Sequence, residues 1–210
     1  MVGSVIAEFT AFAPQGERLS LPVPEREALV KAHFGEEGGQ KVLEPSARPS
    51  PTPTSLRPRL RPVLLAPHLE YTAKKAKEAS APVYNYLFAK VFDFDGGRPA
   101  WHCSDIPYFF HNAQLIPICH QPGWEELERV MCGAFVNFAK TGDPNVEGLP
   151  RWEPCKDGKM LTMVFDNTCY VNENMQDELL PLVQQYKPRF QFQGATPEDE
   201  DGESGNAWVF

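Results

Sequence analysis

Proline places the strongest constraint on how this chain of 210 residues can fold. A proline lacks a backbone N–H and clashes with a preceding helical turn, so closely spaced prolines exclude a helix interior or a central strand. We therefore expect residues 36–63 to form an extended, disordered or foreign segment between two stretches of ordinary globular sequence, 1–35 and 64–189. The residues responsible are Pro45, Pro49, Pro51, Pro53, Pro58 and Pro62, interleaved with Arg48, Arg57, Arg59 and Arg61.

Composition indicates a globular protein without a nucleic-acid partner. The apolar fraction of 42% is ordinary for a folded domain. The net charge is −8, and five of the negative residues lie in the tail 190–210, which we expect to be acidic and mobile. The remainder is only mildly acidic and has no basic face. These acidic residues are Glu198, Asp199, Glu200, Asp201 and Glu203.

We expect neither a membrane span nor a signal peptide. It has no run of eighteen apolar residues, and Met1 is not followed by a basic region and a small-residue cleavage site. The cysteines are odd in number and scattered, which favours free thiols over disulfides. We therefore expect a cytoplasmic protein. The cysteines are Cys103, Cys119, Cys132, Cys155 and Cys169.

Alternating helix and strand patterns predict the α/β class. Alternating or β-branched runs predict strands at 1–7, 82–89 and 160–165. Apolar residues at spacings of three and four predict a core helix at 123–140, and weaker patterns predict helices at 24–34, 66–80 and 175–186. A strand, a helix and another strand in this order are typical of a parallel sheet.

A histidine, His102, lies between a turn-rich loop at 92–99 and a short helix. Ser104 is the expected N-cap of that helix, Asp105 suits its positive end, and Pro107 falls in its first turn. Because an imidazole titrates near neutral pH, a histidine on a rigid loop beyond a strand suits a general base.

Two motifs resemble the type-B carboxylesterase/lipase family, the cholinesterase-like branch of the α/β hydrolases. In this family the acidic member of the catalytic triad lies at the end of a strand, and the motif around it resembles Val2-Gly3-x-x-x-x-Glu8-Phe9. His102-x-x-Asp105-Ile106-Pro107-Tyr108-x-Phe110 resembles its histidine motif. Supporting segments are Ala81-Pro82-Val83-Tyr84, Phe138-Ala139-x-Thr141-Gly142-Asp143-Pro144 and Leu149-Pro150-x-Trp152, so the resemblance covers roughly 1–35 and 64–187.

This resemblance implies the C-terminal part of an α/β-hydrolase fold and the chemistry of acyl transfer. In a Ser-Glu-His triad, His102 would be the general base and Glu8 would orient its imidazole. The implied substrate is a small-molecule carboxylic ester, and no cofactor or metal is implied.

The serine nucleophile is absent from the place where this family carries it. The nucleophile elbow and oxyanion loop precede the acidic residue in the family, whereas seven residues precede Glu8 here. Ser204, in Gly202-Glu203-Ser204-Gly205-Asn206, imitates the elbow but has no leading strand or following helix. We therefore expect the chain to be inactive alone. It would be active only if another chain supplied the serine, or it is a non-catalytic truncated product or binding remnant.

Other interpretations are weaker or remain open. A zinc site built from His102, Cys103, His111, Cys119 and His120 lacks Cys-x-x-Cys spacing. Cys103 adjoins His102 too closely to act as its nucleophile. The segment 36–63 is explained equally by a shifted reading frame or an insertion, and proline-recognition motifs within it recur by chance. A sheet without its N-terminal strands would expose an edge and favour self-association.

Overall fold

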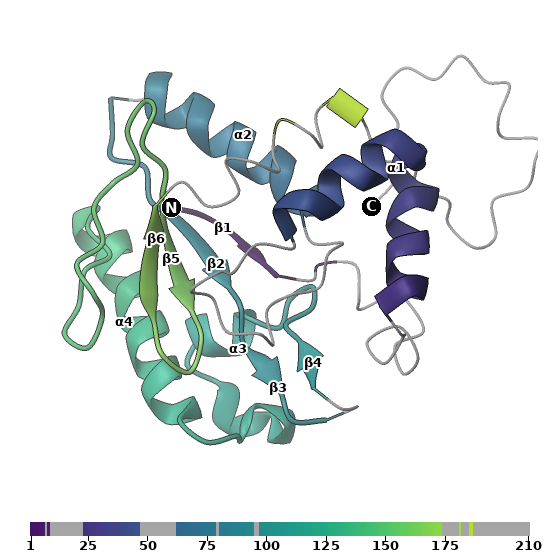
Figure 1. Cartoon of the computed structure of the whole chain (residues 1–210). Helices are drawn as coiled ribbons and strands as arrows, with labels where there is room; N and C mark the ends of the chain where they lie inside the picture. The colour runs from purple at the N-terminus through teal and green to yellow at the C-terminus, as the bar shows by residue number, and fades with distance from the viewer. Residues whose placement is uncertain are drawn as a thin grey trace, which may run out of the picture.

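A four-stranded sheet with helices on both faces forms the centre of the protein (Figure 1). The computed structural model describes residues 1–6, 8, 23–46, 62–78, 80–94, 97–173, 181 and 185–186. Its helices are α1 (Val23–Ser46), α2 (Pro62–Glu78), α3 (Ile106–Phe109) and α4 (Trp124–Thr141), with 3-10 turns η3 (Ala113–Leu115) and η4 (Pro117–Cys119). Its strands are β1 (Val2–Val5), β2 (Asn85–Phe88), β3 (Val91–Phe92), β4 (Arg98–Pro99), β5 (Leu161–Phe165) and β6 (Tyr170–Glu173).

The main sheet is parallel except at one edge. Its strand order is β1-β2-β5-β6, and only β6 runs antiparallel to its neighbour. Val5 pairs with Phe88 and Phe88 with Phe165, so three strands end at the same edge of the sheet. The predicted strands at 1–7, 82–89 and 160–165 and the α/β class are confirmed. The sequence analysis did not predict β6.

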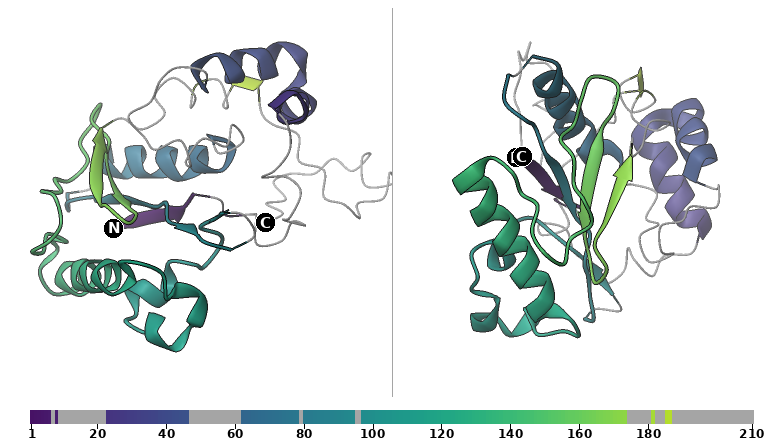
Figure 2. Two further views of the ribbon diagram at one scale, coloured as in Figure 1. Left: turned by 60° about the horizontal axis from the view of Figure 1, so that its bottom comes forward. Right: turned by 90° about the vertical axis from the view of Figure 1, so that its left-hand side faces the viewer.

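Helices cover the two faces of this sheet, as Figure 2 shows: α2 lies over one face, and α3 and α4 lie over the other. Strands buried on both faces need apolar side chains on both sides, and all five residues of β5 are buried. The core between the layers includes Val5, Leu87, Phe88, Tyr108, Met131, Trp152, Met163 and Phe165. In the described part of the chain, no helix is long and apolar enough to cross a membrane.

The helix predicted at 123–140 is confirmed as α4. Gly142 ends it in the left-handed conformation and donates its N–H to the Phe138 carbonyl at 2.8 Å. Leu127 and Met131 are buried against the sheet, as the apolar stripe predicts. Phe135 belongs to the same stripe, yet 37% of it is exposed. The prediction that the whole stripe is core is therefore wrong at this position.

The predicted extended segment 36–63 is wrong in its first part. The helix expected at 24–34 does reach non-helical Gly35, with φ of 75°, but a second helical section continues as far as Ser46. A single proline, Pro45, precedes that end, so the dense prolines begin beyond it. The predicted end of this segment at residue 63 is also wrong, because α2 begins at Pro62. Residues 47–61 lie outside the described part of the chain, as do most of the predicted helix 175–186 and the tail 190–210.

Two local predictions near His102 also differ from the structure. The N-cap of α3 is Asp105, and Ser104 makes no capping bond: its buried hydroxyl has no hydrogen-bond partner. The Tyr108 and Phe109 N–H groups donate to the Asp105 carbonyl at 3.1 and 3.2 Å, so the helix begins one residue later than the sequence predicts. The loop predicted at 92–99 contains the antiparallel ribbon of β3 and β4, in which Phe92 pairs with Arg98.

Candidate active site

Glu8 and His102, 94 residues apart in the sequence, lie in direct contact. Oε2 of Glu8 is 2.8 Å from Nδ1 of His102. Because a carboxylate only accepts hydrogen bonds, this contact assigns the hydrogen to Nδ1. The backbone N–H of His102 also donates to the Glu8 carbonyl at 3.1 Å. Glu8 therefore holds both the backbone and the ring of His102.

The parallel pairing of β1 and β2 brings these two residues together. Glu8 lies three residues beyond the end of β1, and His102 lies beyond β2, its neighbour in the sheet. Between β2 and His102 the chain turns back through β3 and β4, and the Ala100 N–H donates to the Lys90 carbonyl at 2.8 Å. Both residues therefore lie at the carboxyl edge of the sheet, where open α/β sheets place their sites.

The second carboxylate oxygen of Glu8 is fixed by β1. The Val5 N–H donates to Oε1 of Glu8 at 3.2 Å. The N–H groups of Val2 and Ile6 point to β2, so the Val5 N–H points to the opposite side of the strand, away from β2. Glu8 thus orients His102 and also occupies one donor on this edge of β1.

A tight turn aims the ring of His102. The Ser104 N–H donates to the Trp101 carbonyl at 2.9 Å, and Cys103 occupies the third position with a φ of 67°. A positive φ is unusual for a side chain other than glycine, so this turn carries some backbone strain. Trp101 fixes the first position of this turn, because the Trp101 ring lies 4.9 Å from the ring of Phe92 and 4.8 Å from the Arg98 guanidinium.

A second carboxylate, Asp105, lies buried beneath the His102 loop. The Tyr86 hydroxyl donates to Oδ2 of Asp105 at 3.0 Å. Burial raises the pKa of Asp105, and the nearby charge of Glu8 acts in the same direction, whereas the Tyr86 hydrogen bond lowers it. Burial also raises the pKa of Tyr86 well above its ordinary value, so the hydroxyl stays a donor. The sequence analysis named Asp105 as a helix-end residue and as part of the histidine motif, but it assigned no role to Tyr86.

A polar network under α2 was also missed. Nε2 of His68 bonds to the Asn85 side-chain oxygen, and the Asn85 amide donates to the Thr162 hydroxyl at 2.7 Å. Desolvation lowers the pKa of His68, although Asn85 and Glu8 act in the opposite direction. The network joins α2 to the central strands. Single polar residues in apolar runs give no sequence signal for such a contact.

A second histidine–glutamate pair lies between α3 and α4. Nδ1 of His111 is 2.8 Å from Oε2 of Glu128, and the other oxygen of Glu128 accepts the Ala113 N–H at 2.8 Å. Glu128 is buried and His111 is exposed. The distance between Nδ1 and the carboxylate oxygen is the same as in the Glu8–His102 pair, but this pair is not located beyond a strand of the main sheet.

The structure describes two of the three alternative sites, the zinc site and the Cys103 nucleophile, and favours neither. No three histidine, cysteine, aspartate or glutamate side chains gather into a metal site within the described residues. Desolvation and the charges of Asp105 and Glu8 raise the pKa of the Cys103 thiol, which disfavours the nucleophilic thiolate. Ser204 and its flanking glycines lie outside the described residues.

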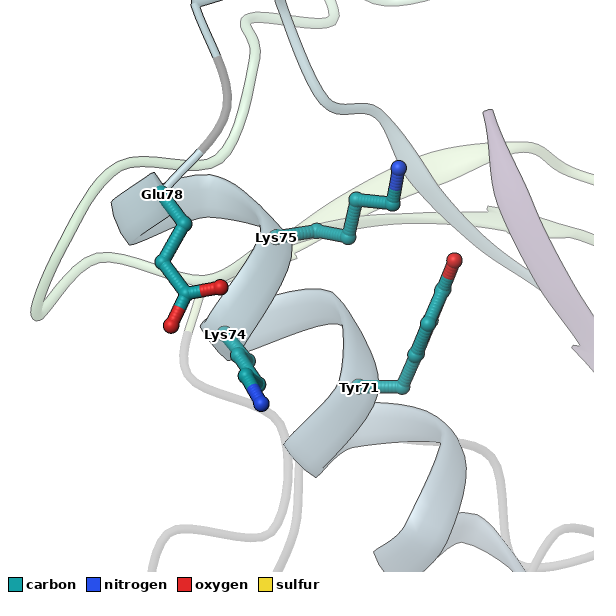
Figure 3. A pocket seen from close by; sticks show the side chains of 4 residues that line it. All are labelled: Tyr71, Lys74, Lys75 and Glu78. Carbon is teal, nitrogen blue, oxygen red and sulfur yellow. The ribbon is translucent and has the colours of Figure 1, made fainter.

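A pocket of about 340 Å³ lies on α2, lined by Tyr71, Lys74, Lys75 and Glu78 (Figure 3). None of these residues belongs to the predicted site.

This mostly parallel sheet, covered on both faces, with a histidine and a carboxylate beyond neighbouring strands, has the architecture of an α/β hydrolase. The sequence profile of the carboxylesterase family matches residues 59–181, more than half of the chain. The chain belongs to the carboxylesterase family.

Comparisons with individual proteins agree with this assignment. Carboxylesterase 5A of Canis lupus familiaris is 38% identical over an alignment of 129 residues that covers 53% of this chain and 22% of that protein. Human bile salt-activated lipase is 34% identical over an alignment of 87 residues that covers 38% of this chain and 11% of the lipase. An esterase from Clostridium hathewayi that can hydrolyze aliphatic aromatic polyesters superimposes with a TM-score of 0.69 and 32% identity, covering 88% of this chain and 37% of the esterase. The chain therefore spans well under half the length of the relatives that it matches.

Proposed function

We propose that the chain supplies the general base and its orienting carboxylate to a serine ester hydrolase. The observation that carries the proposal is the Glu8–His102 contact at the carboxyl edge of the sheet, with Nδ1 bonded to the carboxylate at 2.8 Å. Membership of the carboxylesterase family supports the reaction class. The substrate class is a small-molecule carboxylic ester.

The proposed chemistry assigns one role to each residue. A serine hydroxyl attacks the ester carbonyl while Nε2 of His102 accepts its proton, and the same proton then passes to the departing alcohol. Glu8 keeps Nδ1 protonated and stabilises the imidazolium. Water hydrolyses the acyl-serine by the same steps, with His102 again as base. The serine and the oxyanion donors would come from the part of the fold that this chain does not span, and without that part the chain would be inactive.

The test combines the full chain with a separate polypeptide that supplies the missing part of the fold. The residues of the Clostridium hathewayi esterase outside the matched 37% are co-expressed with this chain, and hydrolysis of a chromogenic short-chain ester is measured. We expect hydrolysis by the pair only. Loss of the base in His102→Ala should lower kcat by about 10²–10⁴-fold. Glu8→Gln should lower it by a comparable factor, because the amide can favour the wrong tautomer.

His111→Ala is the matched control, since His111 makes the same bond to a glutamate elsewhere. It should leave kcat within about twofold of the wild-type pair. Serine-dependent hydrolysis by the purified chain alone, or full activity in His102→Ala, would contradict the proposal.

A further inference from the structure

Three large apolar side chains lie together on the surface formed by α3 and α4. Ile106 and Phe110 are one helical turn apart, since the Phe110 N–H donates to the Ile106 carbonyl at 3.0 Å. The ring of Phe110 lies 5.7 Å from that of Phe135 on α4. Their exposed fractions are 44%, 62% and 37% for Ile106, Phe110 and Phe135. We refer to these three residues as the apolar patch.

The apolar patch is in contact with the buried core. Phe135 contacts the buried Phe109 as well as Phe110, with 5.7 Å between ring centroids in each case. Exposed Leu115, Ile118 and Val136 lie on neighbouring segments. Single exposed apolar residues are common, but contiguous aromatic and aliphatic groups that extend a core mark a surface that another element covers.

The apolar patch adjoins the candidate active site. Ile106 is four residues beyond His102, at the first position of α3. The turn at Cys103 and the Ile106 N–H, which donates to the Cys103 carbonyl at 3.2 Å, hold the start of α3 to the His102 loop. Whatever covers the patch therefore lies next to the general base.

We infer that the apolar patch is where the part of the α/β-hydrolase fold not spanned by this chain docks. The chain superimposes over 88% of its length on an esterase of which it spans only 37%, so the matching fold has extensive further polypeptide. In a layered fold, that polypeptide is what buries the exposed helix surface. The same docking would bring the serine to His102, so the inference rests on the proposed function.

A second copy of this chain is the alternative occupant. It would also bury the apolar side chains, but it would bring another histidine–glutamate pair to the site instead of a nucleophile. The fold match favours the missing hydrolase part.

The test measures association separately from hydrolysis. The full chain is mixed with the remaining part of the Clostridium hathewayi esterase, and binding is followed by sedimentation velocity. We expect a one-to-one complex, and we expect Phe110→Glu and Phe135→Glu each to weaken it more than about tenfold, because a charge replaces an aromatic contact. Circular dichroism should show both variants folded, since these side chains are exposed.

Tyr71→Glu is the matched control, because Tyr71 is an exposed aromatic on α2, over the opposite face of the sheet (Figure 2). It should bind like the wild type. His102→Ala should also bind like the wild type while losing hydrolysis. Patch-dependent binding without hydrolysis would retain the docking surface and contradict the proposed function. Absence of binding, equal binding by the patch variants, or a patch-dependent homodimer in place of the complex would overturn the inference.

Discussion

Glu8 bonds to His102 twice, through its backbone carbonyl at 3.1 Å and through its carboxylate at 2.8 Å. The first bond fixes the loop, and the second fixes the ring and its tautomer. A base in acyl transfer needs its Nε2 free of hydrogen, which is the state that a bonded Nδ1–H leaves.

The tautomer can be measured in the chain alone. In the neutral form of His102, ¹⁵N NMR should find the hydrogen on Nδ1, because the Glu8 carboxylate accepts there. Glu8→Gln should shift the population toward Nε2–H. His120 is an internal control, since its Nε2 lies 3.2 Å from the Gln114 carbonyl and should carry the hydrogen. Mainly Nε2–H signals for wild-type His102 would contradict the geometry.

Gly3 should not tolerate a side chain. A Cβ at this position would lie 1.8 Å from the ring of Tyr86, so Gly3→Ala should lower the free energy of unfolding by about 1–3 kcal/mol. Gly133→Ala is the control. It lies inside α4, where a Cβ meets only Val146 at 3.7 Å, so the variant should gain about 0.5–1 kcal/mol of helix propensity. Urea denaturation measures both, and equal effects would contradict the prediction.

Loss of the Tyr86 hydroxyl should be costly near neutral pH. Tyr86→Phe removes the donor to Asp105, and an unpaired buried acceptor costs about 1–3 kcal/mol. Because that bond lowers the pKa of Asp105, the variant's pKa should rise further. A folded pKa above the unfolded value means that protonation favours the folded state, so the loss should shrink as pH falls. NMR titration of the Asp105 carboxyl carbon and urea denaturation test this, with exposed Tyr71→Phe as control. An unchanged titration would contradict it.

Acid should weaken the attachment of α2 through His68. Desolvation lowers the pKa of His68 in the folded state, so the unfolded chain binds a proton more readily as pH falls below about 6.5. The free energy of unfolding should therefore fall between about pH 7.5 and pH 5.5, and it should fall less in His68→Gln. His120→Gln, at an exposed site, should behave like the wild type. Equal acid sensitivity in His68→Gln and the wild type would show that His68 is not responsible.

Local sequence signals predict α4 almost in full but α1 only in part. The pattern of α4 predicted its extent, because an apolar stripe and an αL glycine are local signals. The second section of α1 lies within the Pro/Arg-rich range 36–63, but the dense prolines begin only beyond Ser46, so the proline density of the whole range conceals this helix. The sequence also predicts Ser104 as the cap of α3, whereas the first helical N–H groups donate to the Asp105 carbonyl, so the helix begins one residue later.

The sequence by itself determined the alternation of strands and helices, the family resemblance, and the identities of Glu8 and His102 as candidate site residues. These follow from periodicities and short motifs that act over a few residues. Only the tertiary structure decided that Glu8 and His102 meet, that Tyr86 bonds Asp105 beneath them, and that Phe110 and Phe135 share an exposed surface. Such contacts join segments up to 94 residues apart, which motifs acting over a few residues do not specify, and the parallel pairing of β1 with β2 is what brings Glu8 to His102.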